Sequence, residues 1–343
     1  MIRLPTIREL FAYNDWARQR LLDASAALAD DALDRPFQMG QGTLRKTLHH
    51  LYAAERVWLD RWLGVVTPPD RRVADRAPLA ALAADQHALA AERDRFIAAL
   101  RDDELSRPVT YTNLRGETNT FELGRLLLHV CNHGVHHRAQ ALNMLRRLGV
   151  ALPKPEIDYI FMKLTQPGGG TRDAAPPPLD RDTLRAYFGY ADWARDRTLA
   201  VAATLSDEQL DRRFEIGLGN LRKTLMHIRF AEEWWLQNWT RGPDEPFPES
   251  PDDLPIAELQ VLSQQTAAGR NAVLERSTDA DLQNWVEARP RPDVQKSFSL
   301  GVTMLQICTH GTHHRAQAAN MLRHVGAEAP ALDVLRMMEP PRC

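Results

Sequence analysis

The chain of 343 residues is poor in cysteine, and this scarcity excludes two classes of protein. Its three cysteines, Cys131, Cys308 and Cys343, form no CxxC zinc motif and are too few for a disulfide framework. A zinc finger and a disulfide-stapled secreted domain are therefore excluded. We expect reduced thiols and a cytoplasmic location.

Long hydrophobic runs and an excess of one charge are also lacking. No run of 18 apolar residues occurs, and charged residues interrupt the first 20 positions, so we expect neither a membrane span nor a signal peptide. The formal net charge of −2 provides no basic footprint for nucleic acid. We therefore expect a globular protein that binds neither membranes nor nucleic acid.

What the sequence does contain is a long internal repeat. Counterparts lie 177 positions apart, so that Asp15-Trp16-Ala17-Arg18 recurs as Asp192-Trp193-Ala194-Arg195. The register holds from about residue 6 to residue 153 and slips by two only near the end, where Ile157-Asp158 matches Leu332-Asp333. Two long repeats indicate a duplicated domain, whereas a solenoid would need several short ones.

The segment between the copies is rich in glycine and proline. Residues 165–178 read TQPGGGTRDAAPPP, which cannot continue a helix. We therefore expect a first domain over residues 1–164, a linker over residues 165–179 and a second domain over residues 180–343.

Helical patterns dominate both copies, and strand signals are almost absent. In the first copy we expect helices over roughly residues 7–28, 43–63, 78–100 and 122–148. Thr6 fits a capping box, Thr43 and Asn220 fit N-caps, and Gly149 fits a C-terminal cap. Only residues 108–120 could hold a short hairpin. The predicted fold class is all-α, as two tandem four-helix bundles.

Comparing the two copies separates the histidines that both copies have from those that only one copy has. His49 corresponds to Met226 and His129 to Gln306, so neither is a ligand common to both copies. Four positions keep histidine in both copies, namely His50, His133, His136 and His137 with their counterparts His227, His310, His313 and His314. Chance retention of such a cluster is less plausible than a shared metal site.

The spacing of these histidines suits a metal ion. His133 and His137 are four residues apart, one helical turn on the same face, and His50 from a neighbouring helix can supply a third imidazole. His136, three residues after His133, is an alternative that spacing leaves open. Three neutral imidazoles leave coordination positions free, as in catalytic zinc sites, and imidazole also suits nickel, copper and iron.

The same residues carry a resemblance to a known family. His50, Glu55 and Trp58, followed by the run His133–Gln140 (HGVHHRAQ), resemble the DinB/YfiT-like superfamily, and the second copy repeats the pattern. One departure is Ala139, where family members often have glycine. The resemblance covers nearly all of both halves.

The resemblance implies a four-helix bundle with one divalent metal ion in each half, most often zinc, with nickel or iron as alternatives. It selects the helix-two histidine and the first and last histidines of the helix-four motif. The implied ligands are His50, His133 and His137 in the first copy and His227, His310 and His314 in the second. Because members commonly dimerise, it also implies that the two halves pack as an intramolecular pseudo-dimer.

Other repeated polar residues have two interpretations each. Gln140 and Gln317 follow the first helix-four ligand by seven residues, which places them on its face, either behind a ligand imidazole or in ordinary packing. For Glu55 we expect structural pairing in preference to a role as general base. For Arg138 we expect a salt bridge or an interface role.

The predicted function is that of a metal-dependent hydrolase or a thiol S-transferase. An open metal site can activate water or bind a thiolate, and the superfamily includes members that use low-molecular-weight thiols. The partner would then be a small-molecule substrate. The alternative is a non-catalytic metal-binding module with a stress-response or structural role. No catalytic base can be assigned from the sequence.

Overall fold

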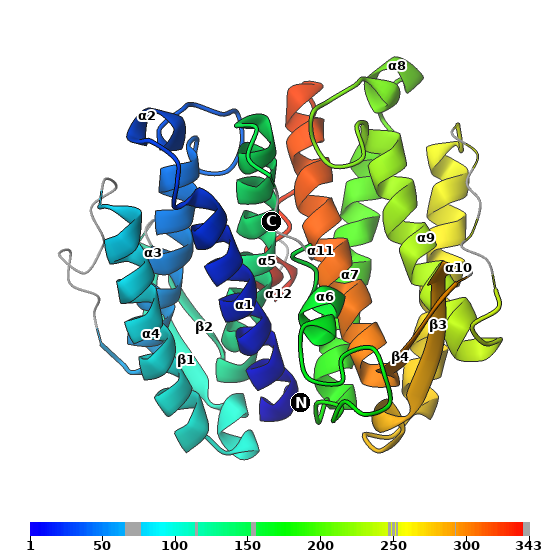
Figure 1. Cartoon of the computed structure of the whole chain (residues 1–343), viewed down its shortest axis with the longest axis horizontal. Coiled ribbons are helices and arrows are strands. Elements are labelled where there is room, and N and C mark those ends of the chain that lie inside the picture. Colours follow the sequence, from blue (N-terminus) through cyan, green and yellow to red (C-terminus); the bar gives the residue numbers. More distant parts are fainter. Residues whose placement is uncertain are drawn as a thin grey trace. The chain divides into compact units, whose positions relative to one another are not determined.

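A computed structural model describes the chain except for residues 66–76, 114–115, 152–155, 246–247, 249–250, 252, 292 and 339–343, and Cys343 therefore lies outside the described residues. Contacts divide the chain into two compact units. Unit 1 consists of Met1–Glu156 with Asp333–Cys343, and unit 2 of Ile157–Leu332. Both units are mostly helical (Figure 1).

Unit 1 is built on long helices and one hairpin. Its described elements are α1 (Leu4–Ser25), α2 (Asp30–Leu33), α3 (Leu44–Trp62), α4 (Leu79–Ala99), the 3₁₀ turn η2 (Asp102–Ser106), β1 (Pro108–Thr112), β2 (Thr118–Glu122), α5 (Leu123–Arg147) and α12 (Val334–Met338). Helix α5 packs against α1 and α3, and α4 packs against the same two helices.

Unit 2 repeats this plan. Its described elements are α6 (Tyr159–Leu164), α7 (Arg181–Ala202), α8 (Asp207–Asp211), α9 (Leu221–Thr240), α10 (Ile256–Arg276), η3 (Asp281–Gln283), β3 (Trp285–Arg291), β4 (Val294–Ser299) and α11 (Leu300–His324). Helix α11 packs against α7 and α9, and α10 packs against the same two helices. The two copies therefore pair their long helices in the same way.

Most of the predicted helix boundaries are confirmed. The Thr43 side chain accepts a hydrogen bond from the Lys46 amide at 3.1 Å, and Asn220 caps α9 by accepting one from the Lys223 amide at 2.8 Å. Helix α5 ends at Arg147, followed by Gly149 with a positive φ of 74°. A left-handed residue at this point satisfies the last carbonyl groups of a helix, and glycine adopts it without strain.

The capping box at Thr6 is wrong. Helix α1 begins at Leu4, and Thr6 lies buried in its first turn. The terminal amide of Leu4 donates to the carboxylate of Asp102 at 2.7 Å, a cap that is supplied from 98 positions along the chain. Pro5 suits the first turn because its fixed φ is already helical.

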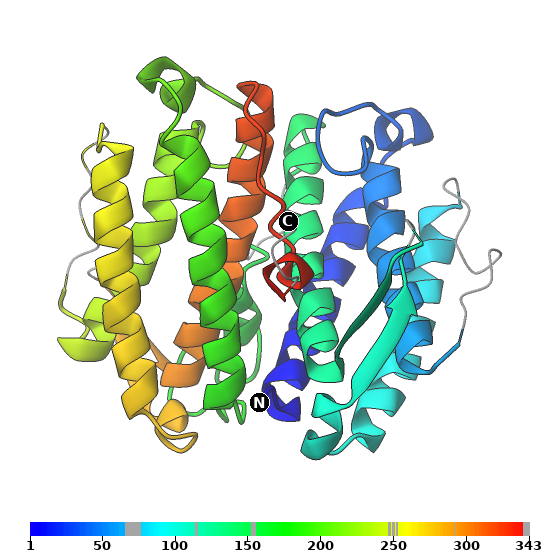
Figure 2. The same ribbon diagram turned by 180° about the vertical axis from the view of Figure 1, so that it is seen from behind.

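The hairpin suspected at residues 108–120 is present. Strands β1 and β2 pair antiparallel from Pro108 opposite Glu122 to Thr112 opposite Thr118. Figure 2 shows this hairpin beside α3 and α5, which it contacts. Strands β3 and β4 form the equivalent hairpin of unit 2.

The boundaries of the units differ from the expected domain boundaries at their ends. Residues 157–164, expected in the first domain, belong to unit 2, where α6 packs against α11 with Tyr159 fully buried. The expected linker also lies in unit 2, where the carbonyl of Gly170 accepts a hydrogen bond from the Ser297 amide at 2.9 Å. In return, α12 packs against α5 in unit 1. Each unit is thus completed by the segment that follows the last long helix of the other copy.

Among the described residues, no helix combines the length and the apolar character needed to cross a membrane.

Candidate metal centres

Three histidines of unit 1 converge between α3 and α5. His50 projects from α3, and His133 and His137 project from α5 one turn apart. Each ring offers a nitrogen atom such that all three nitrogens lie within 4.8 Å of one another. The Nε2 atoms of His50 and His133 are 3.1 Å apart. Residues 83 positions apart in the sequence thus meet at one point because α3 and α5 pack together.

Unit 2 reproduces this triad. His227 on α9 meets His310 and His314 on α11, with 3.0 Å between the Nε2 atoms of His227 and His310. The ring-to-ring distances are 4.9, 4.7 and 4.4 Å in unit 2 and 4.9, 4.5 and 4.4 Å in unit 1. The same geometry therefore occurs twice in one chain.

Gln140 distinguishes His137 from His136. The Nδ1–H of His137 donates to the amide oxygen of Gln140 at 2.7 Å, and the amide nitrogen of Gln140 donates to Nε2 of His136 at 3.1 Å. His137 thereby keeps its Nε2 lone pair for the triad, whereas the Nε2 of His136 is engaged elsewhere. Gln317 holds His314 and His313 in the same way, at 2.8 and 3.0 Å.

In unit 2 a carboxylate accepts a hydrogen bond from one of the triad histidines. The Nδ1–H of His310 donates to Oδ2 of Asp158 at 2.9 Å, which leaves its Nε2 facing His227. Gln306 places this carboxylate, because its amide nitrogen donates to Asp158 at 3.3 Å while its amide oxygen accepts from the backbone N–H of Ile160 at 2.8 Å. Burial raises the pKa of Asp158, but the interaction with His310 outweighs it and holds the pKa far below its ordinary value.

The corresponding carboxylate of unit 1 has a different partner. Asp333 matches Asp158 in the repeat, yet its Oδ1 lies 2.8 Å from Nδ1 of His129. His129 occupies the position of Gln306, so the carboxylate is bound one turn before the first triad histidine. The sequence alone assigned no acidic residue to either site. The match between Ile157-Asp158 and Leu332-Asp333 in the repeat was the signal that could have identified these two aspartates.

Burial favours the neutral form of five of the six triad rings, His310 being left aside. Burial, followed by the neighbouring imidazoles, keeps the pKa of His133 and of His137 well below the ordinary value. Burial also lowers the pKa of His50, and it lowers that of His227 to about 4. Neutral imidazole is the form that binds a metal, so these rings can coordinate one at neutral pH.

The donor set fits a divalent metal ion. Two nitrogen atoms bound tetrahedrally to zinc at roughly 2.0–2.1 Å lie about 3.3 Å apart. The observed separations of 3.1 and 3.0 Å are within a few tenths of an ångström of that value. Three imidazole nitrogens also suit nickel, copper and iron, so the donor set does not select one metal.

Comparison with known proteins places the chain in a family. The family model described as "DinB family" matches residues 1–170 and again residues 181–342. The chain belongs to the DinB family. It is 24% identical over 164 residues to Protein DinB of Bacillus subtilis (strain 168), an alignment that covers 46% of this chain and 95% of that protein. No solved structure matches. Two DinB domains in tandem therefore account for the internal repeat.

The glycine and arginine of the DinB-like motif pack together on α11. A Cβ atom on Gly311 would lie 2.8 Å from Nη1 of Arg315, so the guanidinium occupies the space that this glycine leaves. In unit 1, Arg138 extends to α1, where its Nη1 donates to Oδ1 of Asn14 at 2.5 Å. Within the described residues the hydrogen bonds of both arginines go to neutral side chains and not to a carboxylate, so the salt bridge is not formed, and the expected interface role stays a prediction.

The repeated glutamate of the DinB-like pattern is structural, as expected. Glu55 is 4% exposed and accepts from Arg18 at 2.5 Å and from Arg93 at 2.6 Å. Its counterpart Glu232 accepts from Arg270. Two guanidinium groups occupy both oxygens of Glu55, which leaves it unsuited to act as a general base.

The repeated cysteines of the two DinB domains are buried and free. Burial raises the pKa of the Cys131 thiol well above its ordinary value, and it raises that of Cys308 as well. A buried thiol with a raised pKa is not a nucleophile. A role as small packing residues is consistent with this environment.

Proposed function

We propose that each unit of this DinB-family chain binds one divalent metal ion through its three histidines, zinc in the first place, with nickel or iron as alternatives. The observation that carries the proposal is the convergence of His50, His133 and His137 from two helices, repeated in unit 2 with the same ring geometry. Two matching triads of converging imidazoles are difficult to explain by packing alone.

We propose further that the metal sites serve a hydrolase or a low-molecular-weight thiol transferase acting on a small molecule. A bound metal would polarise a carbonyl group, lower the pKa of water, or bind a thiolate. Three protein ligands leave a coordination position free, and the half-buried rings of His50 and His133 keep the site within reach of solvent. Gln140 and Gln317 would orient one ligand ring in each site, and Asp158 a second ring in unit 2.

The proposal extends to the architecture that the family resemblance implies. Each unit would be a four-helix bundle of the DinB type, supported by the matching pairs of long helices. The two units would pack as an intramolecular pseudo-dimer. The exchange of end segments supports this part, because neither copy completes its unit alone.

Elemental analysis of the untagged protein tests the metal sites. We expect two metal ions per chain, and His50→Ala together with His227→Ala should remove most of them. A value near one ion would contradict two working sites, and a value near zero in metal-supplemented cells would overturn the proposal.

A reaction screen then tests the enzymatic part on the fully loaded protein. Ester hydrolysis, amide hydrolysis and thiol transfer are measured with and without chelator. We expect turnover in one class that chelator abolishes. Loaded protein without turnover in any class would favour the non-catalytic metal-binding module.

A further inference from the structure

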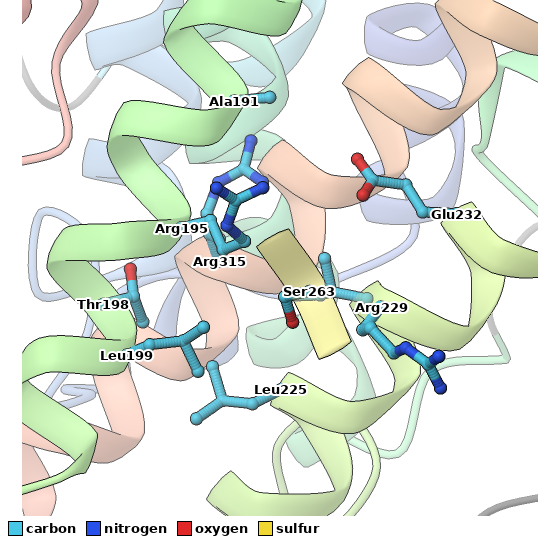
Figure 3. Close-up of a pocket in the computed structure, with 10 residues that line it drawn as sticks. Ala191, Arg195, Thr198, Leu199, Leu225, Arg229, Glu232, Ser263 and Arg315 are labelled. Atoms are coloured by element: carbon cyan, nitrogen blue, oxygen red, sulfur yellow. The ribbon is translucent and has the colours of Figure 1, made fainter. Parts of the chain in front are cut away.

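Unit 2 contains a cavity that is separate from its triad. It opens between α7, α9, α10 and α11, and none of the three triad histidines of this unit lines it. Its polar wall comprises Arg195, Thr198, Arg229, Glu232, Ser263 and Arg315, and leucine side chains face them (Figure 3). Three of these polar residues are arginines, so the positive charge beside the cavity needs negatively charged partners.

The two copies differ at the arginine of the repeated motif. In unit 1 the guanidinium of Arg138 has the amide oxygen of Asn14 as its acceptor. The counterpart of Asn14 in unit 2 is Ala191, which has no acceptor to offer and lines the cavity instead. Among the described residues, Arg315 retains one long hydrogen bond, 3.3 Å to the Thr312 hydroxyl, and its Nε has no partner.

Within the described residues, Arg315 is therefore a buried guanidinium that has no carboxylate partner and lacks the amide acceptor of unit 1. The residue is 4% exposed, and burying an unpaired guanidinium is unfavourable. Its ring contact, 5.8 Å from the centre of Tyr190, is too distant to offset much of that cost. The cavity beside it is the space in which a counterion can lie.

The other charges around the cavity are already paired. Arg195 bonds to Asp192 at 2.7 Å and to Asp196, which is 54% exposed and thus screened by solvent. Arg229 pairs with Glu233 at 2.6 Å. The Glu232 carboxylate, which would repel an anion, is neutralised by the fully buried Arg270, and Arg270 also contacts Asp192. Within the described residues, none of these four carboxylates bonds to Arg315.

The size and the walls of the cavity limit the ligand. The enclosed free space is about 20 Å³, enough for one water-sized group. Ser263, at the position of the larger Gln86, places a hydroxyl group on the wall. Leu199 and Leu225 supply apolar surface. A compact single charge fits this space, whereas a phosphate ester does not.

We propose that this cavity binds one small monovalent anion of halide size, with Arg315 as its counterion and Ser263 as a hydroxyl donor. We place the site in unit 2 because Asn14, which accepts from Arg138 in unit 1, is replaced there by Ala191. The inference goes beyond the proposed metal function and does not depend on it.

Chloride titration of the metal-loaded full chain, followed by the ³⁵Cl NMR line width, tests the site. We expect one saturable chloride site. Ala191→Asn installs the acceptor of unit 1 and should weaken chloride binding at least tenfold, with the metal content unchanged. Because that variant keeps both triads, chloride bound to a metal ion would survive it, and the two explanations are thus separated.

Two further measurements complete the design. Asn14→Ala together with Gln86→Ser should open a second chloride site in unit 1, and the circular dichroism spectrum verifies that each variant is folded. Formate and acetate, which are larger than this space, should not compete with chloride, and competition by either would overturn the assignment to a halide. The absence of saturable binding in the wild-type chain, or unchanged binding in Ala191→Asn, would overturn the proposal.

Discussion

The Nδ1 atom of His310 lies 2.9 Å from a carboxylate oxygen of Asp158, a residue that the sequence repeat assigns to the first copy. A carboxylate behind a ligand histidine fixes the orientation of the ring and raises its basicity. Asp333, the counterpart, bonds to His129 instead of a triad histidine. The two triads therefore have the same three histidines but differ in whether a carboxylate bonds to one of them.

The first prediction follows from this difference. Asp158→Asn should lower the metal affinity of the unit 2 site roughly 10–100-fold, since the ring of His310 loses its anionic partner. The affinity is measured by calorimetric titration in a His133→Ala background, in which only the unit 2 site is intact. Asp333→Asn in a His310→Ala background is the matched control and should change the affinity of the unit 1 site far less. Equal losses in the two experiments would contradict the assignment.

The second prediction concerns the choice between adjacent histidines. The double variant His137→Ala with His314→Ala should lose most of its bound metal, because it removes one ligand from each triad. The variant His136→Ala with His313→Ala should retain it, since those rings accept hydrogen bonds from Gln140 and Gln317. Elemental analysis of both variants measures the bound metal. Loss of metal in the His136/His313 variant, with retention in the His137/His314 variant, would show that His136 and His313 are the ligands.

The third prediction concerns the buried charges of unit 1. Glu55→Gln should destabilise unit 1 by about 3 kcal/mol, because it removes the buried carboxylate that Arg18 and Arg93 share and leaves them with the more exposed Asp15. Hydrogen–deuterium exchange of α1 and α4 peptides localises the effect. Glu122→Gln, at a side chain that is 54% exposed, is the control and should cost less than about 1 kcal/mol. Comparable exchange in the two variants would contradict this account.

The fourth prediction is a dependence of stability on pH. Burial raises the pKa of the Asp15 carboxyl, but the hydrogen bond from Arg93 and the charges of Arg18 and Arg93 outweigh it, so the pKa lies below 3.8. A group whose pKa is depressed by folding stabilises the protein above about pH 4, and this contribution is lost as the pH falls through the folded pKa.

The stability difference between the wild-type chain and Asp15→Asn should therefore be largest near pH 7 and shrink between pH 4 and pH 2. Urea denaturation at several pH values measures it. Asp103→Asn, at a side chain that is 72% exposed, controls for the change of net charge. A difference that stays constant over this range would show that Asp15 does not act through its charge.

Local patterns were enough to predict much of the fold. Helical periodicity located the long helices, and Thr43 and Asn220 marked their starts because a side-chain cap needs only a neighbour three residues away. The start of α1 was misplaced because its cap, Asp102, lies 98 residues from Leu4 in the sequence. A helix cap that is supplied by a residue far away in the sequence cannot be recognised from the residues around the helix start.

The sequence by itself determined the duplication and the four histidines that both copies share, since both depend on the identity and spacing of residues. The family resemblance, and then the contacts of Gln140, separated His137 from His136. Only the tertiary structure decided which segment completes which unit, and hence that Asp158 stands behind His310. It also decided that Arg315 lies buried beside a cavity, in a position where Arg138 has Asn14. These features arise from contacts between residues far apart along the chain, which depend on how helices pack rather than on how any one of them forms.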